Sequence, residues 1–231
     1  MTDRRIVRWS EVLCGSCQAA TVDRFFGANL LARCPGRPSY QQVVNSCEAC
    51  GRAFAQLQHG VVIRTWPTLP GDMVRRMNAV HEAGHAVLGV VTGQPLKRVV
   101  LAADPGVHPG GLVEWDGSYT VLFEDYAGMC WAGQQAVLRW LGERELTTPE
   151  NVLDARYAGF EDVHQATELA YRVTGDTAAA VEAVLGWRDL ADGHLARHWA
   201  AVGVIASELL VHGQLSADHV SGLVTARADH R

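Results

Sequence analysis

Three features that would assign this chain to a familiar class are missing from its 231 residues. No apolar stretch reaches the roughly 20 residues that cross a bilayer, because His, Arg, Asp or Gly interrupts every apolar run. Arg4, Arg5 and Arg8 precede no long apolar segment, so no signal peptide is indicated. A GxxxxGKS/T phosphate loop is also absent, so the chain is not expected to hydrolyse ATP itself. We therefore expect a cytoplasmic protein that does not associate with a membrane.

A strong excess of positive charge is missing as well. The formal net charge is −5, and residues 1–58 hold only seven arginines against four acidic residues. No lysine precedes Lys97, so a nucleic-acid partner is not expected. Hydrophobic residues make up 48% of the chain and charged residues 19%, which is typical of a globular protein. The length allows one domain of ordinary size and a small second one.

The most informative segment is His81-Glu82-Ala83-Gly84-His85. On an α-helix, residues four apart lie on one face, so both imidazoles can bind the same metal ion. Glu82 then projects beside the ion and can act as the base that takes a proton from metal-bound water. This is the HExxH pattern of zinc metalloproteases, in which a third protein ligand and a water complete the zinc site.

The flanking residues predict that this segment is helical. Met73–Val91 contains no proline, Asp72 is a candidate N-cap, and Gly93 is a suitable C-terminal stop. The segment is apolar nearly all round, so the helix should be buried. The alternative is a chance match whose histidines only pack in the core. A metal ion is favoured because buried histidines and a buried glutamate need polar partners.

Five of the six cysteines lie in residues 1–58. Cys14 and Cys17 form one CxxC pair, and Cys47 and Cys50 form a second. Two such pairs can complete a tetrahedral four-thiolate site, so we predict a structural zinc ion in a zinc-ribbon-like domain. Cys34 lies between the pairs and could replace one ligand. Free thiols or a redox CxxC are the alternatives.

Apolar periodicity and turn residues predict the other elements. Cys130 falls in an apolar helix and is expected to be a buried thiol, and Ser216 is a candidate N-cap for the last helix. The remaining elements are a strand-like segment over Phe54–Trp66, a hairpin of strands over Leu96–Leu101 and Leu112–Trp115, a helix from about Tyr119 to Leu141 ended by Gly142, a helix that follows Gly159, and three helical segments after Thr177.

A catalytic zinc ion needs a third protein ligand, because the helical histidine pair supplies only two. The downstream candidates are Glu124, Asp125, Asp154, Glu161, Asp162, His164 and Glu168. Asp162 shares one helical stripe with Gln165, Ala166 and Leu169, and the apolar members suggest an inward face. Periodicity therefore mildly favours Asp162, with His164 as the runner-up.

Three segments resemble the peptidase domain of the FtsH family of ATP-dependent zinc metalloproteases. They are His81–Ala86, which matches the family's extended zinc motif; Ala132–Ala136, in the place of a glycine- and alanine-rich segment; and Asp162–Ala170, which is similar to the family's D-I/V-x-x-A-T-x-x-A segment. The aspartate of that last segment is the family's third zinc ligand, so the resemblance implies this role for Asp162.

The chain also departs from the family pattern. The family carries a membrane tether and an ATPase module before the peptidase, whereas here the cysteine-rich segment occupies that place. Val137 and Leu138 stand where the family usually has two glutamates, which alters the support of the zinc ligands. The resemblance implies a protein or peptide substrate, a separate ATPase or adaptor as partner, and assembly of several copies.

Taken together, the sequence predicts a mainly α (α+β) fold. We expect a cysteine-rich zinc-ribbon-like domain over 1–66, a linker over 67–72, and a helical zinc-metallopeptidase domain with a small β-hairpin over 73–231. The expected function is a zinc endopeptidase with one catalytic and one structural Zn²⁺. The alternatives are an HExxH regulatory peptidase that cleaves a repressor, and an inactive metalloprotease fold that binds protein or nucleic acid.

Overall fold

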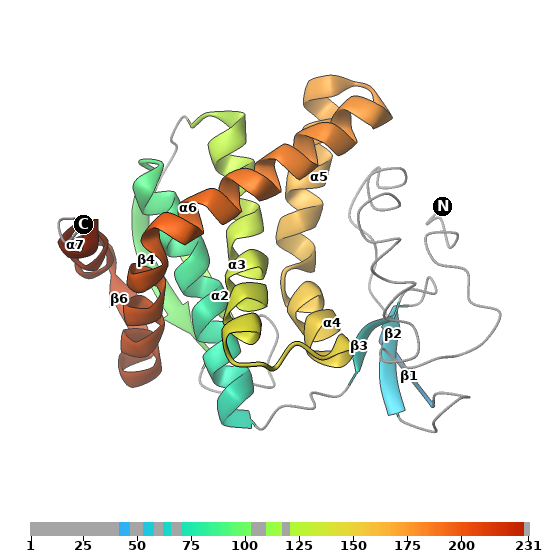
Figure 1. The fold of residues 1–231 in the computed structure, drawn as a ribbon, viewed down its shortest axis with the longest axis horizontal. Helices are drawn as coiled ribbons and strands as arrows, with labels where there is room; N and C mark the ends of the chain where they lie inside the picture. The colour runs from blue at the N-terminus through green and yellow to red at the C-terminus, as the bar shows by residue number, and fades with distance from the viewer. Residues whose placement is uncertain are drawn as a thin grey trace.

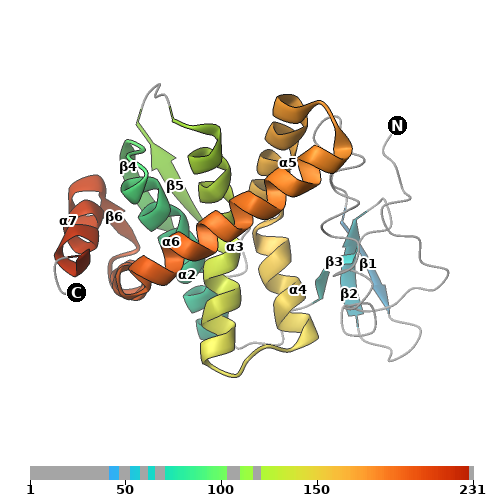
Figure 2. The same ribbon diagram turned by 45° about the horizontal axis from the view of Figure 1, so that its top comes forward.

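The computed structural model describes residues 42–46, 53–57, 62–65, 71–102, 110–116 and 121–228. Over these residues the fold is mainly helical, as the sequence predicts. Helices α2 (Gly71–Val91), α3 (Phe123–Glu143) and α6 (Thr177–His212) contact one another and form the centre of the molecule. Figures 1 and 2 both show α6 crossing α2 and α3. The hydrophobic core lies where these three helices meet.

Helix α2 carries the HExxH segment at its buried middle. It begins at Gly71, so Asp72 lies in its first turn and is not the N-cap that the sequence suggested. The helix ends as expected, because Gly93 adopts a left-handed φ of +77° two residues after Val91. Gly84 faces α3, where a Cβ atom would stand only 2.7 Å from the carbonyl oxygen of Ala132. The two helices therefore approach closely.

Helix α3 differs from its expected bounds at both ends. It begins at Phe123, because Leu122 has extended dihedral angles (φ −66°, ψ 146°), and it continues past Gly142 to Glu143. Helix α6 spans Thr177–His212 but is divided into two helical parts by a kink at His198, whose φ of −114° and ψ of 19° are not helical. With α7 (Ala217–Ala228), these two parts make up the three helical segments that the sequence predicts after Thr177. The backbone N–H of His219 donates to Ser216 Oγ (3.4 Å), which agrees with an N-cap role for Ser216.

The predicted hairpin is part of a three-stranded antiparallel sheet. Strands β4 (Leu96–Leu101) and β5 (Gly111–Trp115) pair as expected. A short strand, β6 (Gln214–Ser216), pairs with the other edge of β4 and gives the order β5-β4-β6. The predicted hairpin is therefore confirmed, and β6 is an additional strand that was not predicted. The sheet packs on α2, which places the start of β5 beside the HExxH segment.

Two further helices separate α3 from α6. Helix α4 (Pro149–Ala158) was not predicted, whereas α5 (Phe160–Thr174) follows Gly159 as expected. Helix α5 packs against α3 and α6, and Asp162 in its first turn lies beside His81 and His85 of α2. No helix in the described part of the chain is long and apolar enough to cross a bilayer.

The N-terminal part contains a second antiparallel sheet. It consists of β1 (Gln42–Ser46), β2 (Ala53–Leu57) and β3 (Val62–Thr65) in sequential order. The segment that we expected to be strand-like over Phe54–Trp66 thus contains two paired strands. The five N-terminal cysteines, which are Cys14, Cys17, Cys34, Cys47 and Cys50, lie outside the described residues.

Candidate metal centre

The HExxH segment places its three polar side chains inside the protein. His81, Glu82 and His85 are each no more than 7% exposed. The two imidazole rings lie one helical turn apart, with centroids separated by 4.7 Å and a steep angle of 74° between their planes. Their Nε2 atoms are 3.0 Å apart, so both face the same point in space. The helical spacing alone predicts this pairing.

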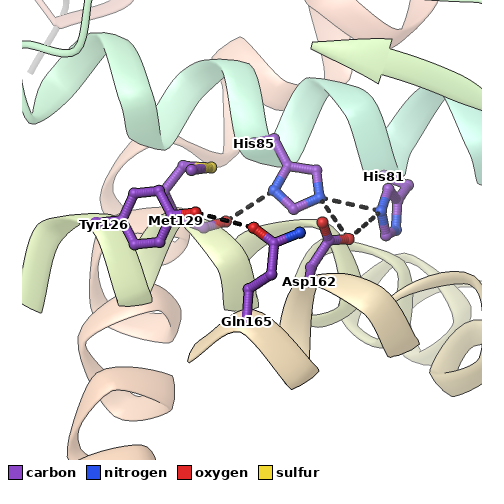
Figure 3. Close-up of polar contacts among 6 residues, drawn as sticks. All are labelled: His81, His85, Tyr126, Met129, Asp162 and Gln165. Atoms are coloured by element: carbon purple, nitrogen blue, oxygen red, sulfur yellow. Dashed lines mark hydrogen bonds and ion pairs between the residues drawn. The ribbon is translucent and has the colours of Figure 1, made fainter. Parts of the chain in front are cut away.

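Asp162 reaches the same point from α5. Its Oδ2 atom lies 3.3 Å from His81 Nε2 and 3.2 Å from His85 Nε2 (Figure 3). The residue is in the first turn of α5, where the helix dipole favours a negative charge. Its side chain is 29% exposed, so this side of the site is more open than the side formed by α2.

The three donor atoms form a nearly regular triangle that fits a metal ion. The edges are 3.0, 3.2 and 3.3 Å. Ligands bound at 2.0–2.1 Å to one tetrahedral ion are about 3.3–3.4 Å apart. Two imidazole nitrogens and one carboxylate oxygen are also a donor set that suits zinc and similar divalent ions. The group could therefore hold a metal ion, and it is the one such group of His, Cys, Asp or Glu among the described residues.

A backbone carbonyl fixes the orientation of His85. Its Nδ1 atom lies 2.7 Å from the carbonyl oxygen of Met129 on α3, and this contact is buried. A carbonyl only accepts hydrogen bonds, so Nδ1 must carry a proton and donate. When the ring is neutral, Nε2 is then the unprotonated nitrogen that a metal requires. The sequence gives no signal for this contact, because every residue has a backbone carbonyl.

His85 and Asp162 shift each other's pKa values because their charges attract. Burial by itself would lower the pKa of His85, but the neighbouring Asp162 carboxylate outweighs it and raises the pKa to about 9. Burial would raise the pKa of Asp162, yet the two imidazoles hold it well below its usual range. The carboxylate is therefore ionised and available as a ligand at neutral pH.

Glu82 is in a different environment. Burial raises the pKa of its carboxyl group, and the nearby histidines only partly oppose this shift. Glu82 is not one of the three grouped donors, since its side chain lies against Gly111 at the start of β5. A carboxyl group with a raised pKa beside a metal site is suited to proton transfer.

The runner-up ligand, His164, is directed elsewhere. It is only 1% exposed, and its Nε2 atom lies 3.6 Å from Glu168 Oε1 rather than in the group around Asp162. Cys130 is buried and is not part of the group either, as expected. The cysteine ligands predicted for a structural zinc ion cannot be placed, because they lie outside the described residues.

A hydrogen bond at the open side links the two helices that flank the centre. The Tyr126 hydroxyl on α3 donates to Gln165 Oε1 on α5 over 2.8 Å. Gln165 is one turn after Asp162 and is exposed, and Figure 3 shows its amide on the same side as the Asp162 carboxylate. The contact joins α5 to α3 close to the donor triangle.

Comparison of the sequence with models of known protein families and with curated proteins found no match.

Proposed function

We propose that the protein is a zinc-dependent endopeptidase of the HExxH type. His81, His85 and Asp162 are the ligands of the catalytic zinc ion, and Glu82 is the base. The observation that carries the proposal is the arrangement of three donor atoms within 3.3 Å of one another, with a buried carboxyl group next to them in sequence. The resemblance of three segments to the FtsH family supports peptide bonds as the substrate.

The zinc ion supplies Lewis-acid chemistry: it polarises a substrate carbonyl and lowers the pKa of a water molecule to about 7. The protein side chains do the rest. Glu82 takes a proton from the attacking water and later gives it to the leaving amine, so its own protonation state is restored at the end of each cycle. The raised pKa of Glu82 favours the first step, because a stronger base accepts the proton of the water more readily.

Met129 and Asp162 have supporting tasks in this scheme. The Met129 carbonyl keeps the proton of neutral His85 on Nδ1, which leaves Nε2 for the ion. The Asp162 carboxylate supplies negative charge, which reduces the net charge of the loaded centre. The partial exposure of Asp162 leaves the substrate an approach from the α5 side.

The roles that we propose for the N-terminal domain, the substrate and the partner follow from the resemblance to the FtsH family. We propose a zinc-ribbon-like N-terminal domain with Cys14, Cys17, Cys47 and Cys50 around a structural zinc ion. Substrates would be unfolded segments of proteins, delivered by a separate ATPase or an adaptor. Assembly of several copies would serve such delivery and is not needed for hydrolysis, since all four proposed catalytic-site residues belong to one chain.

The proposal is tested with fluorescein-labelled casein as the substrate. Protein stripped of metal with a chelator should be inactive, and two equivalents of zinc per chain, one for each proposed site, should restore cleavage. Zinc-loaded Glu82→Gln protein is the matched control, because it keeps the ligands and lacks the base. A zinc-loaded wild-type protein that cleaves neither casein nor short peptides would contradict the proposal and favour a binding role.

A further inference from the structure

Two glycines border the candidate metal centre, one on α3 and one on β5. A Cβ atom on Gly133 would stand 2.7 Å from Cε1 and Nε2 of His81, and it would be closer still to Nε2 of His85. A Cβ atom on Gly111 would stand 2.8 Å from Cδ and Oε1 of Glu82, and closer to Cγ. Real Cβ atoms essentially never approach other atoms to less than 3.0 Å. Neither position has room for a methyl group.

Backbone conformation does not explain these glycines. Positive φ angles occur at Gly93, Gly175 and Gly213 among the described glycines, and neither Gly111 nor Gly133 is among them. Gly133 lies inside α3 and Gly111 begins β5, where glycine is less favourable than alanine for the element itself. Both glycines instead leave room for the side chains of the proposed catalytic-site residues beside them.

We propose that Gly133 and Gly111 are positioning residues with separate tasks. Gly133 keeps free the volume that the ligand nitrogens and the ion occupy. Gly111 lets the carboxyl group of Glu82 lie against the start of β5. The inference rests on the metal centre of the proposed function, and it does not require that the centre cleaves peptides.

The neighbours of Gly133 cannot move aside easily. His85 is held by its hydrogen bond to the Met129 carbonyl, which belongs to the same helix as Gly133. His81 is buried, and α2 and α3 are in close contact along the site. A methyl group at position 133 must therefore displace an imidazole or fill the place of the ion, and either outcome weakens metal binding.

The surroundings of Gly111 lead to a different expectation. The three atoms nearest to its hypothetical Cβ all belong to Glu82, and they include Cγ, close to the backbone of α2. A methyl group here must shift the whole Glu82 side chain, which is buried and only 7% exposed. Neither histidine is among these nearest atoms, so the three metal ligands should keep their positions.

The first test compares Gly133→Ala with Gly128→Ala on the same helix. A Cβ atom on Gly128 would make ordinary contacts with Leu190 Cδ2 at 3.4 Å and Leu88 Cδ2 at 3.6 Å, which makes it a matched control. Zinc affinity is measured by competition with a chelating dye. Gly133→Ala should bind zinc at least ~10-fold more weakly than wild type, while Gly128→Ala should be unchanged. Wild-type zinc affinity in Gly133→Ala would overturn this part of the proposal.

A second measurement covers the case in which Gly133→Ala folds poorly. The substitution is repeated in a His81→Ala/His85→Ala background, which removes the atoms that the methyl group would meet. There, thermal unfolding should show no loss of stability, because alanine favours the helix. An equal loss in both backgrounds would mean that Gly133 serves packing alone, against the proposal.

The test of Gly111 uses Gly111→Ala in two backgrounds. Zinc affinity should stay within about threefold of wild type, smaller than the ~10-fold effect of a disturbed ligand environment. Gly111→Ala should lower the melting temperature of wild type, and most of this loss should vanish in a Glu82→Ala background. The same loss in both backgrounds, or a zinc affinity as weak as that of Gly133→Ala, would refute the assigned role.

Casein cleavage is measured in parallel to separate this inference from the proposed function. If both hold, Gly111→Ala should lower kcat at least ~10-fold with little change in KM, since the base is displaced while the ligands stay. If zinc-loaded wild type is inactive, the proposed function fails. The zinc affinities and melting temperatures still decide the roles of Gly111 and Gly133 in that case.

Discussion

One carboxylate oxygen of Asp162 lies 3.2 Å from Nε2 of His85, although two strands (β4 and β5) and two helices (α3 and α4) lie between the two residues along the chain. The contact depends on the packing of α5 against α3, which itself contacts α2. The same oxygen is 3.3 Å from Nε2 of His81. The HExxH pair therefore meets a third donor with the spacing that a zinc ion needs.

Replacing that donor should weaken the metal site. Asp162→Asn keeps the shape of the side chain but removes its negative charge, so zinc affinity should fall at least ~10-fold. His164→Ala is the control on the same helix. It should lower the melting temperature because His164 is buried, yet leave zinc affinity unchanged. Competition with a chelating dye measures both variants, and zinc loss in His164→Ala alone would reverse the assignment.

Glu82 should be dispensable for metal binding and essential for hydrolysis. Glu82→Gln keeps the shape and burial of the side chain while it removes the proton acceptor. Casein cleavage should fall by at least ~100-fold, the scale of general-base catalysis. Zinc content, determined by mass spectrometry, should equal that of wild type. A fully active Glu82→Gln protein would show that another group accepts the proton.

The cysteine pairs predict a second zinc ion. Purified protein should contain two zinc ions per chain, one at each proposed site. The double variant Cys14→Ser/Cys17→Ser should lose one ion and unfold its N-terminal part more easily, because structural zinc contributes directly to folding. One ion per chain in both proteins would exclude the ribbon site. The catalytic site should stay loaded, and casein cleavage can verify this.

Cys130 should be chemically inert in the folded protein. Burial raises the pKa of its thiol, so the reactive thiolate is scarcer than in an exposed cysteine at any given pH. The side chain is also almost inaccessible, with 2% exposure. Iodoacetamide should therefore label Cys130 at least ~100-fold more slowly in native protein than after unfolding. Peptide mass spectrometry after timed labelling gives both rates, and similar rates would contradict the buried position.

The sequence could predict the part of the site that local geometry determines. His81 and His85 share a face of any α-helix, so a helix predicted over Met73–Val91 is enough to pair them. Asp162 could be ranked above His164 because helical periodicity and the family resemblance agreed. The contact itself needs tertiary packing, and only the structure brings α5 to α2.

Other features had no usable local signal. Strand β6 has three residues, and it forms only because β4 offers a partner from a distant part of the chain. Helix α4 has little separation of apolar and polar faces, so periodicity could not identify it. Gly133 is one of several small residues in its part of the chain, and the structure shows that it faces the two imidazoles. That orientation depends on which helix lies opposite, which sequence periodicity does not specify.

The most direct test of the metal centre is an anomalous difference map at the zinc absorption edge from crystals of the zinc-loaded protein. We predict a peak bound by Nε2 of His81, Nε2 of His85 and a carboxylate oxygen of Asp162. Glu82 should lie beside the ion without binding it. A peak that is coordinated by His164 while Asp162 faces solvent, or the absence of zinc from His81 and His85, would contradict the account.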